Sequence, residues 1–85
     1  ERAVAPRLAA EMNRVAAVAR ARGDVAAACE AAASALVAAG FRQIDYVTVR
    51  NATTLAAPSG EAGEALRVLM AAWLGKTRLI DNTGV

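Results

Sequence analysis

The feature that most constrains this chain is an apolar stretch that is followed, after one glycine, by a second short stretch of strand-forming residues. The first stretch, residues 66–74, reads LRVLMAAWL and contains one charged residue, Arg67. It is too short and too apolar for a surface helix, and it is typical of a strand that is buried on both faces. Gly75 allows the backbone to reverse, because glycine adopts positive φ without steric cost. Residues 77–82 then return beside the first stretch, so the sequence predicts an antiparallel hairpin.

A helical pattern occupies the start of the chain, from residue 1 to about residue 22. Apolar residues recur there at steps of three and four, which makes one stripe along a helix. Pro6 fits only in a first helical turn, so we expect the helix proper to begin near Ala5 and to end at Gly23. The stripe consists of Val4, Leu8, Met12, Val15 and Ala19, and the charged residues expected on the exposed side, at spacings that allow pairing, are Arg7, Glu11 and Arg14.

A second helix is predicted over residues 25–39. Asp24 precedes it, and an aspartate in this position accepts hydrogen bonds from the free N–H groups of the first helical turn. Gly40 follows it and is typical of a residue that ends a helix in the left-handed conformation. Cys29 lies on the apolar stripe of this helix, where we expect a small buried hydrophobic residue. The two helices should form a hairpin joined at residues 22–24.

A strand is predicted at residues 41–50, because residues 46–49 are aromatic or β-branched. Residues 51–63 follow as a loop rich in turn residues, and Leu55 is expected to pin this loop to the protein. Strict alternation along the strand predicts one face that carries Asp45, Val47 and Val49, and another that carries Ile44, Tyr46, Thr48 and Arg50.

Together these elements predict an α+β fold of two layers, in which a helical hairpin packs on a three-stranded antiparallel sheet in the order α-α-β-β-β. We expect residues 1–85 to be a single small domain with the strand at residues 65–74 in the centre of the sheet. The helices can cover only one face of that strand, so a partner chain or another domain should cover the second face. The predicted core contains Leu8, Met12, Val15, Cys29, Leu36, Phe41, Val47, Val49, Val68 and Met70.

The composition excludes several classes of function. The net charge of +2 comes from 10 basic and 8 acidic residues spread along the chain, and this pattern does not favour binding to nucleic acid. With no histidine and one cysteine, histidine-based catalysis, zinc sites built on histidine or cysteine, and an internal disulfide are all excluded. No apolar run approaches the roughly 20 residues of a membrane span, so we expect no membrane partner and a cytoplasmic protein.

The sequence predicts no catalytic, cofactor-binding or metal-binding constellation. The best candidates for a contact with phosphate, or with another domain on closure, are Lys76 and Arg78, which we expect two residues apart on one face of a strand at the hairpin end. The interpretation we favour is a solvated sheet edge, or a structural pair of Arg78 with Asp81 or Asp45.

The loop before the hairpin offers weaker candidates. Gly60 and Gly63 suggest a phosphate-binding loop, but the Lys-Ser/Thr pair of such loops is missing, so we expect a plain connecting loop. Glu61 and Glu64 are conceivable as an acid–base pair, but no pocket is evident beside them, which favours solvated roles. Cys29 has no activating base, because the chain lacks histidine.

Residues 75–82, GKTRLIDN, resemble the closing signature Gly-x-Thr-Arg-Leu-Ile-Asp-Asn of the pantothenate synthetase (pantoate–β-alanine ligase) family. Residues 44–49, followed by Thr54 and Leu55, are similar to the family's DYVEV…TL segment, and two helical stretches precede both in the family as well. The resemblance spans essentially the whole chain but only the C-terminal part of the family's enzymes. The chain also starts inside a helical pattern without an initiator methionine, so we expect it to be part of a longer protein.

The resemblance implies that this chain is the lid domain of an ATP-dependent ligase. Such enzymes join pantoate to β-alanine through a pantoyl-adenylate, release pyrophosphate and AMP, and serve the coenzyme A pathway. The implied partner is an N-terminal nucleotidyltransferase domain, which holds ATP and Mg²⁺. The family's enzymes are homodimers, and this N-terminal domain makes most of the contact between the two subunits. That domain's HIGH-type histidine motif and KMSKS-like loop are not in this chain, so the chain alone should bind no cofactor and should not catalyse. The resemblance assigns no catalytic role to Arg78, Asp81 or Asn82.

Two alternatives stay open. The first is a free-standing homo-oligomerisation or protein-interaction module that uses the uncovered face of the sheet. The second, which the mild charge and the scarcity of aromatic residues disfavour, is a small RNA-binding α+β domain.

Overall fold

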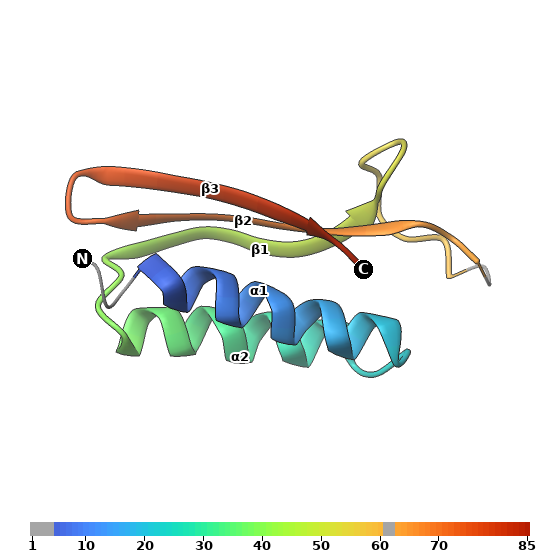
Figure 1. The fold of residues 1–85 in the computed structure, drawn as a ribbon, viewed down its shortest axis with the longest axis horizontal. Helices are drawn as coiled ribbons and strands as arrows, with labels where there is room; N and C mark the ends of the chain where they lie inside the picture. The colour runs from blue at the N-terminus through green and yellow to red at the C-terminus, as the bar shows by residue number, and fades with distance from the viewer. Residues whose placement is uncertain (1–4, 61–62) are drawn as a thin grey trace.

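The computed structural model describes residues 5–60 and 63–85, which form two helices followed by three strands. The helices form one layer and the strands form a second layer that lies across them (Figure 1). The predicted α+β fold and its α-α-β-β-β order are therefore confirmed, while the parts of the predictions that concern residues 1–4 and Glu61 lie outside the described residues. The elements are α1 (Ala5–Arg20), α2 (Val25–Ala38), β1 (Gln43–Asn51), β2 (Leu66–Leu74) and β3 (Thr77–Gly84).

The turn between the two helices differs from the prediction by one residue. Arg22, not Gly23, adopts the left-handed conformation with φ of 58°, and the Gly23 N–H donates to the Val18 carbonyl over 2.9 Å. A Cβ atom at Gly23 would lie 3.0 Å from Cγ1 of Val18, so any larger residue here would force the Val18 side chain to shift. The next helix begins as predicted, because the Asp24 carboxylate accepts a hydrogen bond of 3.0 Å from the Ala27 N–H.

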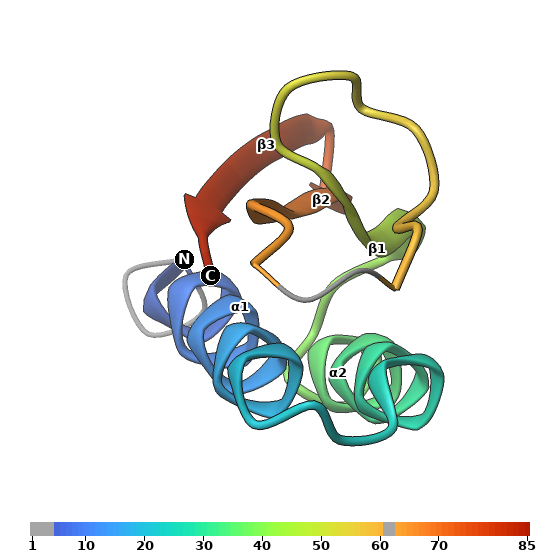
Figure 2. The same ribbon diagram turned by 90° about the vertical axis from the view of Figure 1, so that its right-hand side faces the viewer.

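The sheet is an antiparallel meander in the order β1-β2-β3, so β2 is central as predicted. Gly75 lies between β2 and β3 with φ of 60°, which is the conformation that the predicted hairpin requires. The two helices cover one face of the sheet, as the end-on view shows (Figure 2). That face carries Val49 from β1 and Val68, Met70 and Ala72 from β2.

A β-bulge in β1 changes the faces that strict alternation predicts. The register shifts between Ile44, which pairs with Ala72, and Tyr46, which pairs with Ala71, so Asp45 is an extra residue without a partner in the ladder. Ile44 therefore packs against the core, and Asp45 lies on the outer face with Tyr46. The prediction that Asp45 shares a face with Val47, and Ile44 with Tyr46, is wrong for this reason.

The core lies between the helices and the sheet. Eight of the ten predicted core residues are buried, while Cys29 and Val47 are half-buried against the same cluster. Glu11 was expected to be exposed but is only 3% exposed, because it lies three residues from Leu8 and four from Val15 on the buried side of α1. Its carboxylate does pair with Arg14 as predicted, with Nη1–O distances of 3.1 and 3.2 Å.

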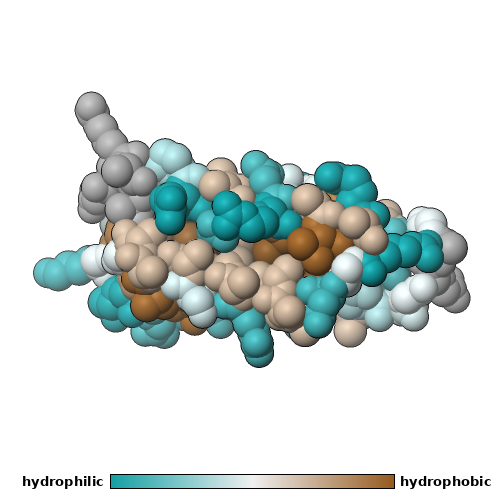
Figure 3. Space-filling model, turned by 90° about the horizontal axis from the view of Figure 1, so that it is seen from below, coloured by the Kyte–Doolittle hydropathy of each residue, from teal (hydrophilic) through white to brown (hydrophobic). Residues whose placement is uncertain are grey.

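The far side of the helix layer is covered mainly by weakly apolar and hydrophilic residues, with smaller strongly hydrophobic areas (Figure 3). The large apolar residue of α2 that is exposed, Val37, borders a shallow hollow together with Ile44 of β1, and other exposed positions of α2 carry alanines such as Ala27 and Ala31. Among the residues that the structure describes, no helix is both long and apolar enough to cross a membrane.

The packing of α2 leads to a stability prediction with a control one residue away. Leu36 is fully buried, so Leu36→Ala should lower the free energy of unfolding by about 2–5 kcal/mol through lost burial and a residual cavity. Val37 is 55% exposed, so Val37→Ala should change it by less than about 0.5 kcal/mol. Urea unfolding followed by circular dichroism measures both values, and equal losses in the two variants would contradict the observed orientation of α2.

Candidate functional site

The outer face of the sheet, which points away from the helices, is uncovered in the part of the chain that the structure describes. Its central row is Tyr46, Ala71 and Ile80, which lie directly opposite one another on the three strands. Ala71 is fully buried, because the larger side chains of Tyr46 and Ile80 flank it, whereas these two are 39% and 61% exposed. The next row has half-buried Leu69 at its centre. This arrangement agrees with the predicted uncovered face and identifies which face it is.

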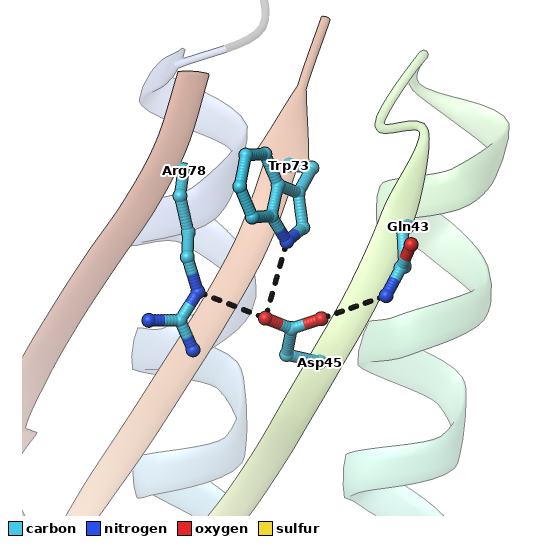
Figure 4. A network of polar contacts seen from close by, with 4 residues as sticks. All are labelled: Gln43, Asp45, Trp73 and Arg78. Atoms are coloured by element: carbon cyan, nitrogen blue, oxygen red, sulfur yellow. Dashed lines mark hydrogen bonds and ion pairs between the residues drawn. The ribbon is translucent and has the colours of Figure 1, made fainter. Parts of the chain in front are cut away.

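Asp45 organises the polar end of the outer face (Figure 4). Its Oδ2 atom accepts hydrogen bonds from Arg78 Nε at 2.8 Å and from Trp73 Nε1 at 3.2 Å, and its Oδ1 atom accepts one from Gln43 Nε2 at 3.0 Å. The bond from Arg78, followed by that from Trp73, lowers the pKa of this carboxyl below its ordinary value and outweighs the opposing effect of desolvation. Asp45 is therefore an ionised structural centre that connects all three strands.

The structure places the two predicted contact residues in different settings. Arg78 lies on β3, and its Nε atom forms the ion pair with Asp45, which is one of the two structural pairs that the sequence suggested. Lys76 lies in the turn between β2 and β3 and is exposed, so it is not on a strand as expected. A contact of either residue with phosphate or with a closing domain stays a prediction.

Arg42 fastens the same end of the sheet and was not singled out from the sequence. Its guanidinium carbon lies 5.1 Å from the centre of the Trp73 ring, within the range of a cation–π interaction. Its Nε atom donates a hydrogen bond of 2.9 Å to the Gly75 carbonyl. Arg42 thus ties the start of β1 to the β2–β3 turn. The sequence signal for this contact was Trp73, two positions before Gly75, because arginines stack on tryptophan rings.

Glu64 closes the long loop between β1 and β2. Its carboxylate accepts hydrogen bonds from Asn51 Nδ2 at 2.8 Å and from the backbone N–H groups of Ser59 and Gly60 at 3.0–3.2 Å. The bond from Asn51 is the main cause that lowers the pKa of Glu64. The prediction that Glu64 has only a solvated role is therefore wrong. The connecting loop is held in place by the Glu64 carboxylate.

Leu55 does not anchor the loop, so the prediction that it would do so is wrong. Its side chain is 55% exposed, and its backbone has φ of 60°, a left-handed conformation that is unusual for leucine. The loop is held instead by Asn51, whose Oδ1 atom accepts hydrogen bonds from the N–H groups of Thr53 and Thr54 at 2.8 and 3.0 Å.

The remaining groups of the described residues give no reactive site. Burial raises the pKa of the Cys29 thiol, which keeps it protonated and weakly nucleophilic. A hollow of about 420 Å³ lies between the helix turn and the loop, and its polar lining includes Arg20, Arg22 and the already bonded Glu64. Within residues 5–60 and 63–85, no group of three or more acidic, cysteine or histidine side chains is placed to hold a metal ion.

These features define the chain as a small α+β domain with one partly apolar sheet face that is uncovered in the described residues. The family described as pantoate-beta-alanine ligase matches residues 1–84. The chain belongs to the pantoate–beta-alanine ligase family, whose members are ligases of pantothenate biosynthesis.

Curated relatives agree with this assignment. The chain is 48% identical over 89 residues to "Pantothenate synthetase" of Caulobacter vibrioides and 47% identical over 85 residues to that of Paramagnetospirillum magneticum. The protein of the same name from Mesorhizobium japonicum is 49% identical over 85 residues. Each match covers 100% of this chain but only 29–30% of the relative, namely its C-terminal part.

The Asp45 centre leads to a prediction about pH. Because the folded-state pKa of Asp45 lies below its ordinary value of 3.8, its contribution to stability is fully present above that value and is lost as the pH falls through the folded-state pKa. Asp45→Asn should therefore destabilise the chain at neutral pH, and the difference from wild type should shrink under strongly acidic conditions. Urea unfolding at several pH values measures this.

Asp81→Asn is the matched control for the Asp45 variant. The Asp81 carboxylate is exposed, and its hydrogen bond is to the neighbouring Asn82 N–H. The control should be less destabilised than Asp45→Asn at neutral pH. An Asp45→Asn penalty that stays constant as the pH falls would argue against an ionised structural centre.

Proposed function

We propose that this chain is the C-terminal lid domain of a pantothenate synthetase, the ligase that joins pantoate to β-alanine through a pantoyl-adenylate. The observation that carries the proposal is the match of the entire chain to the C-terminal 29–30% of relatives with that name. The open sheet face supports it, because a lid needs a surface that contacts the body it closes over.

The role of a lid follows from the chemistry of an acyl-adenylate. Such an intermediate is hydrolysed by water, so a domain that closes over it protects the product of the first step. We assign ATP, Mg²⁺ and the catalytic groups to an N-terminal nucleotidyltransferase domain of the same enzyme, and most of the homodimer contact as well. The described residues contain no candidate metal cluster, and their best-placed carboxylates, Asp45 and Glu64, already have structural partners. Cytoplasmic location belongs to the same proposal.

A second candidate function is a free-standing module for homo-oligomerisation or protein interaction. The observation that favours it is the exposure of Tyr46 and Ile80 on either side of Ala71 on one face, since exposed apolar patches mark interaction sites. The two candidates differ in whether the chain affects a ligase reaction.

The experiment uses a chimera in which this chain replaces the matching C-terminal part of the Caulobacter vibrioides pantothenate synthetase. The chimera should release AMP from ATP, pantoate and β-alanine at a rate near that of the parent, and the parent truncated before this part should lose most of its turnover. The isolated chain should form no AMP. Full activity of the truncated parent would contradict a lid role, and a chimera that folds but stays inactive would favour the interaction module.

A further inference from the structure

Two arginines lie directly opposite each other on the outer face of the sheet. Arg50 of β1 pairs in register with Arg67 of β2, and both are half-buried. Like charges directly opposite on a sheet destabilise it. Arg67 Nε donates to the neutral Asn82 Oδ1 atom at 2.7 Å, and no carboxylate of the described residues pairs with either arginine. This pair therefore lacks a counter-charge within the described part of the chain.

The remaining charges of the outer face do not compensate this pair. The strands place three arginines there, Arg50, Arg67 and Arg78, against one acidic residue, Asp45, and Arg42 adds a further positive charge over Trp73. Asp45 already forms its ion pair with Arg78. Partly desolvated arginines are best satisfied by a carboxylate, which can accept two parallel hydrogen bonds.

Apolar residues adjoin the arginines on the same face. Leu69 lies in the row next to Arg67, and Tyr46 and Ile80 follow in the row beyond it. The first part of the loop between β1 and β2 rises on the side of the sheet away from the helices, whereas its later part returns toward the turn between the helices (Figures 1 and 2). That loop holds exposed Leu55 in its left-handed conformation, and backbone strain of this kind suggests a functional constraint. The face thus combines an apolar centre with an unbalanced positive edge.

We propose that the outer face of the sheet is the surface on which this lid docks onto the preceding part of the full-length ligase, and that the docking surface supplies a carboxylate to Arg50 and Arg67. This inference rests on the proposed function. The relatives are more than three times as long as this chain, so an enzyme of that length has a large body available for the contact. Charge complementarity argues against a second copy as the occupant, because a two-fold interface would bring the same positive face against itself.

Matched variants of the chimera test the docking face. Ile80→Asp and Arg67→Glu should each lower kcat/KM by at least about tenfold, because they place a charge in the apolar centre or reverse the complementary charge. Val37→Asp and Arg20→Glu, which make the same changes at exposed positions of α2 and α1, should leave it within about twofold. Unfolding of the isolated variants shows whether each of them still folds.

Hydroxyl-radical footprinting gives a readout that does not depend on activity. Tyr46 and Ile80 should react severalfold more slowly in the chimera than in the isolated chain, while Val37 should react equally in both. Protection of both residues in an inactive chimera would support the docking face and contradict only the lid function. An active chimera in which Val37 alone is protected, or in which Val37→Asp alone impairs turnover, would overturn the docking face.

Sedimentation of the isolated chain tests the competing occupant. If the chain forms a dimer that Ile80→Asp dissociates, and the same substitution leaves the chimera fully active, the face belongs to a second copy and the inference is overturned. A monomer with an impaired Ile80→Asp chimera supports docking on the preceding part of the ligase.

Discussion

The burial of one face of β2 against the two helices is the interaction on which the rest of the structure depends. Val68, Met70 and Ala72 are at most 1% exposed, and full burial of side chains such as valine or methionine is worth about 1.5–3 kcal/mol each. Because β2 is the central strand, its orientation determines which face of β1 and β3 points outward. The alanine-rich helices cover this face, and the opposite face is uncovered in the described residues.

The outer face owes its polar end to a local irregularity in β1. The bulge adds Asp45 without a partner in the ladder, which turns its carboxylate toward Trp73 and Arg78 on the two other strands. A single ionised group thereby joins β1, β2 and β3 on the side where no helix supports them. Arg42 strengthens the same end through Trp73 and Gly75. These contacts hold the three strands together next to the apolar centre of the outer face.

The order and type of the elements were predictable, because α1 has a strong helical period, β2 is a continuous apolar run, and Asp24 and Gly75 mark a helix start and a turn. The bulge was not, since nothing in residues 44–46 alone indicates that alternation fails there. The burial of Glu11 was within reach of the period, because Glu11 falls on the stripe itself. The opposition of Arg50 and Arg67 depends on the register between strands, which is a property of the folded chain.

The bulge also has a consequence for how this sheet can change in evolution. Ile44 faces the core and Tyr46 faces outward on either side of Asp45, so these two residues already have the alternation of a regular strand. Deletion of position 45 would therefore restore an unbroken ladder and leave every other side chain of β1 on its present face. Insertions and deletions inside strands normally invert a face. At this one position the strand can therefore lose one residue without a change in the pattern of buried and exposed residues.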